Sequence, residues 1–233
     1  MARVGQRRYN LKYRALGGDA SAVAFGPGSV FQIDANNVDC YFVSSIDRKR
    51  IIERPTLYLI VDVFTRMIVG FCVVIENASY CSAALALQNA AQDKVEYCAS
   101  YGIKISEAEW PSAALSEMLV ADKAELLGKK SNHLVDAFGM RISNTPPYRA
   151  DLKPFIERLF HTINQKLIHS LPGAVLKPHE RGERDCRLDA AFTLNEFRKT
   201  SIIACHQCAA HRGQAQSTGS PCVTTLRLLQ GQH

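Results

Sequence analysis

The segment FQIDAN, residues 31–36, alternates strictly between apolar and polar side chains. A period of two is typical of a β-strand, because successive side chains of a strand point to opposite faces of a sheet. The alternation therefore predicts a strand with one face in an apolar layer and with Asp34 on the other face. Aspartate is disfavoured in strands, so something other than local preference has to account for Asp34 at this position.

Further strands and helices follow from similar patterns. Two runs rich in β-branched and aromatic residues, 56–64 and 67–76, are separated by a short polar connection, which predicts an antiparallel meander with the first strand. The first strand is expected to extend through residue 43. Ser79 is a suitable N-cap for a helix over residues 80–101. The remaining predicted elements are strands at 118–121 and 140–143 and helices at 125–138, 152–170 and 194–211.

This order of elements predicts an α/β protein with a ribonuclease H-like fold, in which a five-stranded mixed sheet is flanked by helices. Glycine and proline at Gly26-Pro27-Gly28 break the chain before the first strand. We therefore expect a basic N-terminal arm over residues 1–28 and a core domain over residues 29–175. A connector with a C-terminal helix is expected over residues 176–211, followed by a poorly ordered tail over residues 212–233.

The composition is that of a globular protein with an excess of positive charge. Hydrophobic residues make up 47% of the 233 residues, and the formal net charge is +6. Such an excess is compatible with a polyanionic partner. The N-terminus shows no signal-peptide pattern, and the apolar run 57–75 is a poor membrane span because it contains Asp62 and Arg66. The eight cysteines show no framework spacing, which predicts reduced thiols in a cytoplasmic protein.

Three acids stand where the predicted fold can bring them together. Asp34 lies on the first strand, Asp122 at the end of the fourth strand, and Glu157 on the polar face of a late helix. In this fold the two strands are neighbours and the helix crosses above their ends. Such a cluster suits phosphoryl transfer on a polynucleotide, because carboxylate oxygens can hold two Mg²⁺ or Mn²⁺ ions. Taken singly, each acid also fits a structural role, as a helix cap or as a solvated helix residue.

Four blocks around these acids closely resemble the catalytic core of TnsB-type DDE transposases, relatives of phage Mu transposase and the retroviral integrases. The blocks are FQIDAN, PTLYLIVDVFTRMIVGF, LVADKAELLG and NTPPYRADLKPFIERLFHTINQKL. The resemblance covers roughly residues 13–204. It places Asp34, Asp122 and Glu157 on the family's catalytic, metal-binding triad. The second and third acids are 157 − 122 = 35 positions apart, a spacing typical of these enzymes.

The resemblance implies a DNA transposase that cleaves the 3′ end of a transposon and joins it to target DNA with the help of two Mg²⁺ or Mn²⁺ ions. It also implies a homo-oligomer on DNA, with an ATPase regulator and a second nuclease subunit as partners, in the bacterial cytoplasm at the nucleoid. Arg149 and Lys153 would stand beside the carboxylates and contact DNA phosphates. We expect Lys123, directly after Asp122, to be a third DNA-binding residue.

Two other functions remain open. The chain could be a different ribonuclease H-like nuclease that cuts RNA in hybrids or branched DNA. It could also be a degenerate transposase remnant that binds DNA without catalysis, which would fit Lys123-Ala124 in place of the family's usual Arg-Gly pair. Among the other conspicuous residues, Asp62 is interpreted as structural, Trp110 as core packing, and Cys205 and Cys208 as buried helix thiols rather than zinc ligands.

Overall fold

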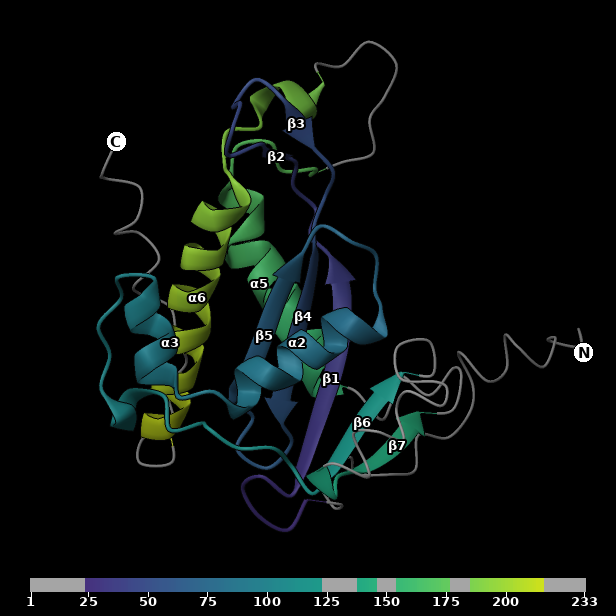
Figure 1. Ribbon diagram of the computed structural model, residues 1–233, viewed down its shortest axis with the longest axis vertical. Coiled ribbons are helices and arrows are strands. Elements are labelled where there is room, and N and C mark those ends of the chain that lie inside the picture. Colours follow the sequence, from purple (N-terminus) through teal and green to yellow (C-terminus); the bar gives the residue numbers. More distant parts are fainter. Residues whose placement is uncertain (1–23, 123–137, 146–153, 177–184, 216–233) are drawn as a thin grey trace, which may run out of the picture.

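The computed structural model describes residues 24–122, 138–145, 154–176 and 185–215, and its centre is a five-stranded mixed sheet with the order β5-β4-β1-β6-β7 (Figure 1). Neighbouring strands β5, β4 and β1 are antiparallel, whereas β6 runs parallel to both β1 and β7. The five strands are β1 (Val30–Asn37), β4 (Thr56–Asp62), β5 (Ile68–Val74), β6 (Met118–Asp122) and β7 (Arg141–Thr145). The predicted ribonuclease H-like architecture and the antiparallel meander are confirmed.

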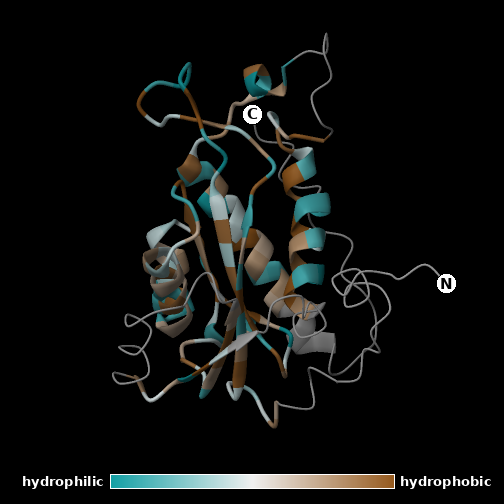
Figure 2. Cartoon of the chain, turned by 90° about the vertical axis from the view of Figure 1, so that its right-hand side faces the viewer, coloured by the Kyte–Doolittle hydropathy of each residue, from teal (hydrophilic) through white to brown (hydrophobic). Residues whose placement is uncertain are grey.

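Helices cover both faces of this sheet (Figure 1). α2 (Tyr80–Ala91) packs on one face, and α5 (Pro154–Lys166) and α6 (Leu194–Ala215) pack on the other. All seven residues of β4 are buried, because its side chains alternate between the two apolar layers. Figure 2 shows hydrophobic colouring along much of the central strands. A double-sided core of this kind leaves few places in the sheet for a charged side chain.

The packing of α2 on β5 depends on small residues. Ala83, Ala86 and Ala90 are fully buried at this contact. Gly70 of β5 faces them so closely that an added Cβ would lie 2.8 Å from the carbonyl oxygen of Ala86 and 2.8 Å from the Cβ of Ala90. The backbones of α2 and β5 can approach to this distance only because position 70 has no side chain.

The helix predicted over residues 80–101 is in fact two helices, α2 and α3 (Lys94–Ser100). Asp93 begins the second helix, since its side chain accepts a hydrogen bond from the backbone N–H of Glu96 at 2.7 Å. Lys94 stops the first helix, α2, from continuing. Its buried Nζ donates to the carbonyl oxygens of Asn89, Ala90 and Gln92 at 2.6, 3.2 and 2.9 Å, carbonyls that a continuing helix would have bonded internally.

The first strand ends at Asn37 and does not reach residue 43 as predicted. Residues 42–43 instead form β2 (Phe42–Val43), which pairs with β3 (Ile51–Ile52) in a separate two-stranded sheet. β2 lies apart from the main sheet and contacts segments from late in the chain. The backbone N–H of Val43 donates to Phe192, and the ring of Phe42 lies 4.9 Å from that of Phe197 in α6. The short helices η3 (Ile168–Ser170) and η4 (Cys186–Asp189) belong to the same region.

Trp110 and Cys205 are buried, as predicted, whereas Cys208, predicted to be buried as well, is only partly buried. Trp110, after the short helix η1 (Glu107–Glu109), is 1% exposed and donates from Nε1 to the carbonyl oxygen of Ile68 at 2.8 Å. Cys205 of α6 is buried in the core cluster, and burial raises the pKa of its thiol. None of the seven cysteines that the structure describes is part of a disulfide bond. No helix in the described ranges is both long and apolar enough to span a bilayer.

Gly70→Ala is expected to destabilise the protein by about 1–3 kcal/mol, because the new methyl group would push α2 away from β5. Gly26→Ala is the matched control, since a Cβ at position 26 would meet no atom within 4 Å and the residue does not need a left-handed backbone. Urea unfolding of both variants measures the difference. Equal stabilities for the two variants would contradict the proposed close packing.

Lys94 gives a pH-dependent prediction. Burial lowers the pKa of Lys94 from 10.5 to about 8 in the folded protein. Between these values the unfolded chain binds the additional proton, so this group's contribution to stability rises with pH. The free energy of unfolding of the wild type, minus that of Lys94→Met, should therefore rise by up to about 3 kcal/mol from pH 7.5 to pH 10.5. The buried thiols are present in both proteins and largely cancel in this difference, which should be flat if Lys94 keeps its ordinary pKa and stays protonated in the folded protein.

Candidate active site

Asp34 lies near the middle of the central strand β1, between β4 and β6. Its side chain is half-buried. The preceding residue, Ile33, packs in the cluster around α2, whereas Leu59, the cross-strand partner of Asp34, packs in the cluster around α5 and α6. Because cross-strand partners share a face, Asp34 projects from the sheet face that carries α5. The prediction that Asp34 points away from the layer of Phe31 and Ile33 is confirmed.

Asp122 is the last residue of β6, the strand parallel to β1. The register pairs Val30 with Met118 and Gln32 with Val120, a constant offset of 118 − 30 = 88 positions. Continuing the register by two residues places the backbone of Asp122 beside Asp34, one strand away. Neighbouring strands are separated by about 4.8 Å. The side chain of Asp122 lies outside the described part of the chain.

Glu157 stands in the first turn of α5, where a negative charge is favoured by the helix dipole. α5 packs against β1, the strand that carries Asp34, and against the neighbouring strand β4. Its buried stripe consists of Ile156, Leu159, Phe160 and Ile163, and Leu167 directly after the helix continues it, whereas Phe155 is only partly buried. Glu157 lies outside this stripe and is exposed. The exposed position leaves its carboxylate accessible to a ligand.

Continued by two residues, the register of β1 and β6 would set the backbones of Asp34 and Asp122 side by side, and Glu157 stands on the helix that packs against β1 and β4. Within the described residues, no three His, Cys, Asp or Glu side chains form a group that could hold a metal ion, and Asp122 is not part of that set. The predicted DNA-binding residues Arg149, Lys153 and Lys123 also lie outside the described residues. In donor chemistry, carboxylate oxygens are the ligands that Mg²⁺ and Mn²⁺ prefer.

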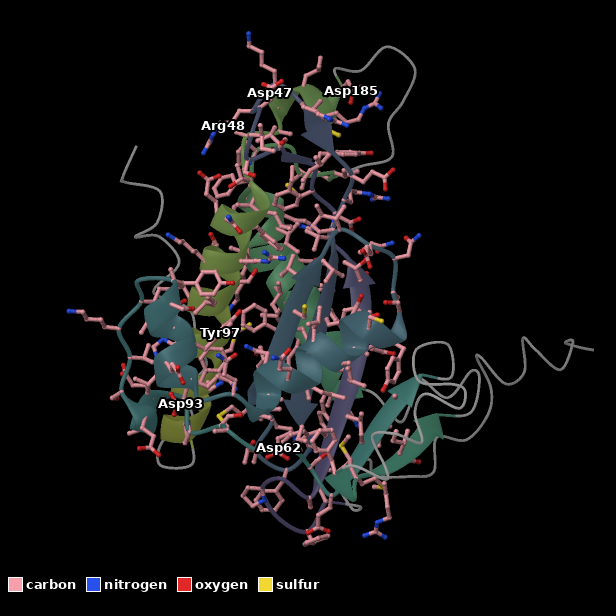
Figure 3. The ribbon with its side chains drawn as sticks, in the orientation of Figure 1. Asp47, Arg48, Asp62, Asp93, Tyr97 and Asp185 are labelled. Atoms are coloured by element: carbon pink, nitrogen blue, oxygen red, sulfur yellow. The ribbon has the colours of Figure 1, made fainter. Side chains whose placement is uncertain are left out.

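Asp62, the other acid in the meander, has a structural role, as predicted. It is 2% exposed at the end of β4 and accepts hydrogen bonds from the backbone N–H groups of Phe64 and Thr65, both at 3.3 Å. It also accepts one from the Thr65 hydroxyl at 2.7 Å. Figure 3 shows Asp62 at one end of the sheet, far from Asp47, Arg48 and Asp185 at the other. Its oxygens are committed to the turn between β4 and β5.

Arg66, in the same turn, is a residue whose importance the sequence did not reveal. Its backbone adopts a left-handed conformation, with φ of 64°. The carbon of its guanidinium group lies over the ring of Phe155, 2.9 Å from the ring centre, so the turn contacts the first turn of α5. In the sequence Arg66 was part of a polar connection between two strands, and the shortness of that connection was the one available signal of a strained turn.

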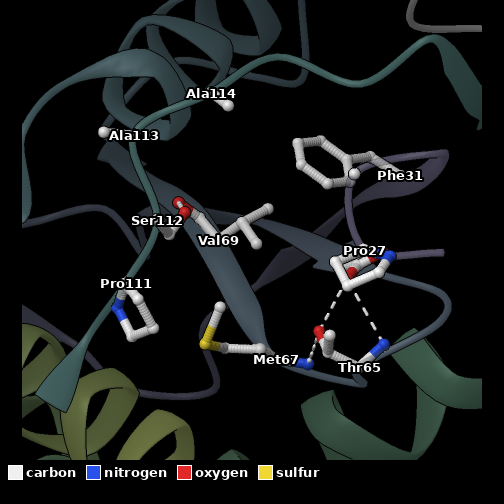
Figure 4. Close-up of a pocket in the computed structure, with 11 residues that line it drawn as sticks. Pro27, Phe31, Thr65, Met67, Val69, Pro111, Ser112, Ala113 and Ala114 are labelled. Atoms are coloured by element: carbon white, nitrogen blue, oxygen red, sulfur yellow. Dashed lines mark hydrogen bonds between the residues drawn. The ribbon is translucent and has the colours of Figure 1, made fainter. Parts of the chain in front are cut away.

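A cavity of about 380 Å³ lies at the same end of the sheet (Figure 4). Its lining is mostly apolar and includes Phe31, Met67, Val69 and Pro111. Neither Asp34 nor Glu157 belongs to the lining. This cavity is therefore separate from the acids on the α5 face.

A mixed five-stranded sheet with an acid on its central strand and a second at the end of the adjacent parallel strand is the architecture of ribonuclease H-like transposase and integrase cores. Residues 32–173 match the family model described as the TnsB C-terminal domain. The chain belongs to this family of transposases, and the resemblance inferred from its four sequence blocks is confirmed.

Two curated relatives support the assignment. The chain is 42% identical over 206 residues to the Transposon Tn7 transposition protein TnsB of Escherichia coli, an alignment that covers 87% of this chain and 29% of the relative. It is 26% identical over 178 residues to the transposase for transposon Tn552 of Staphylococcus aureus, covering 73% of this chain and 32% of the relative. The chain thus spans about a third of the length of these relatives.

Two solved structures are similar in outline. The HTLV-2 integrase catalytic core domain, in a complex with magnesium, aligns with a TM-score of 0.41 and 10% identity over 87% of this chain and 93% of its own. The catalytic core domain of BIV integrase aligns with a TM-score of 0.39 and 9% identity, covering 84% of this chain and 88% of its own.

The structural role of Asp62 can be tested by comparing the stability of an Asp62 variant with that of a variant at the surface residue Asp39. Asp62→Ala is expected to lower the free energy of unfolding by about 2–3 kcal/mol, because it leaves three donors of a buried turn without their acceptor. Asp39→Ala removes only a surface ion pair with Arg54, at 3.0 Å, and should cost less than about 1 kcal/mol. Thermal and urea unfolding measure both. A loss no larger for Asp62→Ala than for Asp39→Ala would contradict the structural role.

Proposed function

We propose that this chain is the catalytic core of a metal-dependent DNA transposase, which cleaves the 3′ end of a transposon and transfers the freed strand to target DNA. The observation that carries the proposal is the register of β1 and β6, which, continued two residues beyond its last pair, would set the backbone of Asp122 beside Asp34. The helix of Glu157 packs on the face from which Asp34 projects. Membership of the TnsB family supports the choice of reaction. Asp34, Asp122 and Glu157 are the proposed catalytic residues.

The same three residues would hold the metal, with two Mg²⁺ or Mn²⁺ ions as the proposed complement. When bound, divalent ions activate a water or a sugar hydroxyl as the nucleophile and stabilise the oxygen that leaves the scissile phosphate. The donors fit, since all three are carboxylates. Without a cation, carboxylates gathered in this way repel one another, so a metal would also stabilise the arrangement.

The protein's own contribution is to hold these oxygens in place. Asp34 is fixed because β1 is hydrogen-bonded on both edges, to β4 and to β6. Glu157 is carried by a helix that rests on the sheet through a single apolar stripe, so its position can adjust more readily than that of Asp34. Arg149, Lys153 and Lys123 are proposed to contact DNA phosphates, which position DNA without reading its sequence.

The proposed partners follow from the family. Double-stranded DNA at transposon ends and at the target would be bound by several copies of the protein acting together. One related structure is an intasome of a simian T-cell lymphotropic virus, and the bacterial relatives are transposition proteins. An ATPase regulator and a second nuclease subunit are further proposed partners, in the bacterial cytoplasm at the nucleoid.

Asp34→Asn is expected to abolish Mn²⁺-dependent cleavage and strand transfer, with a loss of at least 100-fold, because the amide cannot replace a carboxylate ligand. The assay uses duplex DNA carrying the ends of the protein's own element. Titration with Mn²⁺ alone should show weakened binding in the same variant.

The matched control is Asp47→Asn. Asp47 lies in an exposed loop and accepts a hydrogen bond from the backbone N–H of Lys49 at 3.0 Å, which an asparagine can also accept. This variant should behave as the wild type. Equal strand transfer by Asp34→Asn would sink the proposal, and Asp34-dependent cutting of RNA–DNA hybrids without strand transfer would assign the site to another ribonuclease H-like nuclease.

A further inference from the structure

We infer that Arg66 is a positioning residue, which holds the first turn of α5 against the β4–β5 turn and so fixes Glu157 relative to Asp34. The inference rests on the proposed function, because it concerns the proposed ligand Glu157. It starts from the contact between the guanidinium group of Arg66 and the ring of Phe155, two residues before Glu157.

The turn that carries Arg66 is rigid. The backbone N–H of Arg66 donates to the carbonyl oxygen of Asp62 at 2.8 Å, and the N–H of Asp62 donates to Met67 at 3.0 Å. The Thr65 hydroxyl accepts from the N–H of Met67 at 3.3 Å and donates to the carboxylate of Asp62. Asp62 is buried and belongs to the central sheet. Arg66 is therefore anchored to the same sheet that carries Asp34.

The backbone of Arg66 is in a conformation that a residue with a Cβ seldom adopts. In the described residues it is the one non-glycine residue with a positive φ, at 64°. Glycine would meet this requirement without strain. Backbone strain persists where the surrounding structure compensates for it, and it gathers at functional sites. The arginine side chain supplies a contact that glycine cannot make.

That contact controls the rotation of α5. The helix rests on the sheet through its buried stripe, which by itself resists rocking about the helix axis only weakly. With about 100° of rotation per residue, Phe155 and Glu157 lie on opposite flanks of the stripe. A cation placed over an aromatic ring is attracted to its face. Holding the Phe155 flank against the fixed turn therefore sets the height of the Glu157 flank above the sheet.

Arg66→Gly is the decisive variant, because it removes the side chain and relieves the strained φ at the same time. The melting temperature should stay the same or rise. The Mn²⁺ concentration for half-maximal binding, measured with Mn²⁺ alone on the complete chain, should rise about tenfold, the effect typical of losing a group that orients a ligand. Amide hydrogen exchange in the first turns of α5 should become faster.

Control variants distinguish a positioning role of Arg66 from general effects on folding and on charge. Arg50→Gln removes an exposed positive charge at the other end of the molecule and should leave all three measurements unchanged. Phe155→Leu keeps an apolar side chain but lacks the ring, so it should weaken Mn²⁺ binding as Arg66→Gly does. The double variant should be no worse than either single variant, because both remove the same contact.

The outcomes are distinct. Unchanged Mn²⁺ affinity and unchanged amide exchange in Arg66→Gly would overturn the inference while leaving the proposed function intact. If Asp34→Asn instead bound Mn²⁺ as tightly as the wild type, the proposed metal site would be overturned, and with it the role of Arg66 toward that site. Additive losses in the double variant would show that Arg66 and Phe155 act separately, which also contradicts the inference.

Discussion

The hydrogen bonding of β1 on both edges is the constraint on which the rest of this structure depends. β1 pairs antiparallel with β4 and parallel with β6, and its two faces meet different helices. A slip of one residue would move Asp34 to the opposite face, beneath α2, together with Gln32 and Asn36. The double pairing excludes this, so one carboxylate is held at a fixed point of the sheet. Continuing the ladder between β1 and β6 by two residues would align the backbone of Asp122 with it.

The turn between β4 and β5 extends this rigid frame to the far side of the site. Asp62 binds the turn to the sheet, and Arg66 connects the turn to Phe155 at the start of α5. One part of the proposed metal site is thus built into the sheet, and the other is carried by a helix that the turn supports. Such support suits the proposed metal site, because ligands bind best when neighbouring contacts hold them in position.

Much of the fold was predictable from local patterns, and the errors have physical causes. The antiparallel meander follows from the runs rich in β-branched and aromatic residues, and the structure confirms it. The break after α2 was missed, because Lys94 ends that helix through a buried amine, whereas lysine in a sequence indicates an exposed, helix-compatible position. The early end of β1 was missed because residues near Phe192 and Phe197 pair with β2 from a distant part of the chain. Neither cause has a local signal.

The sequence by itself determined which side chains could share a face, which acids were available and to which family the chain belongs. It could do so because period, residue type and the spacing of motifs are properties of the linear chain. Only the tertiary structure decided the parallel register of β1 and β6, which runs toward Asp34 and Asp122, and the contact of Arg66 with Phe155. Both depend on the register and approach of segments far apart in sequence, which are fixed by the packing of the whole core and not by any one segment.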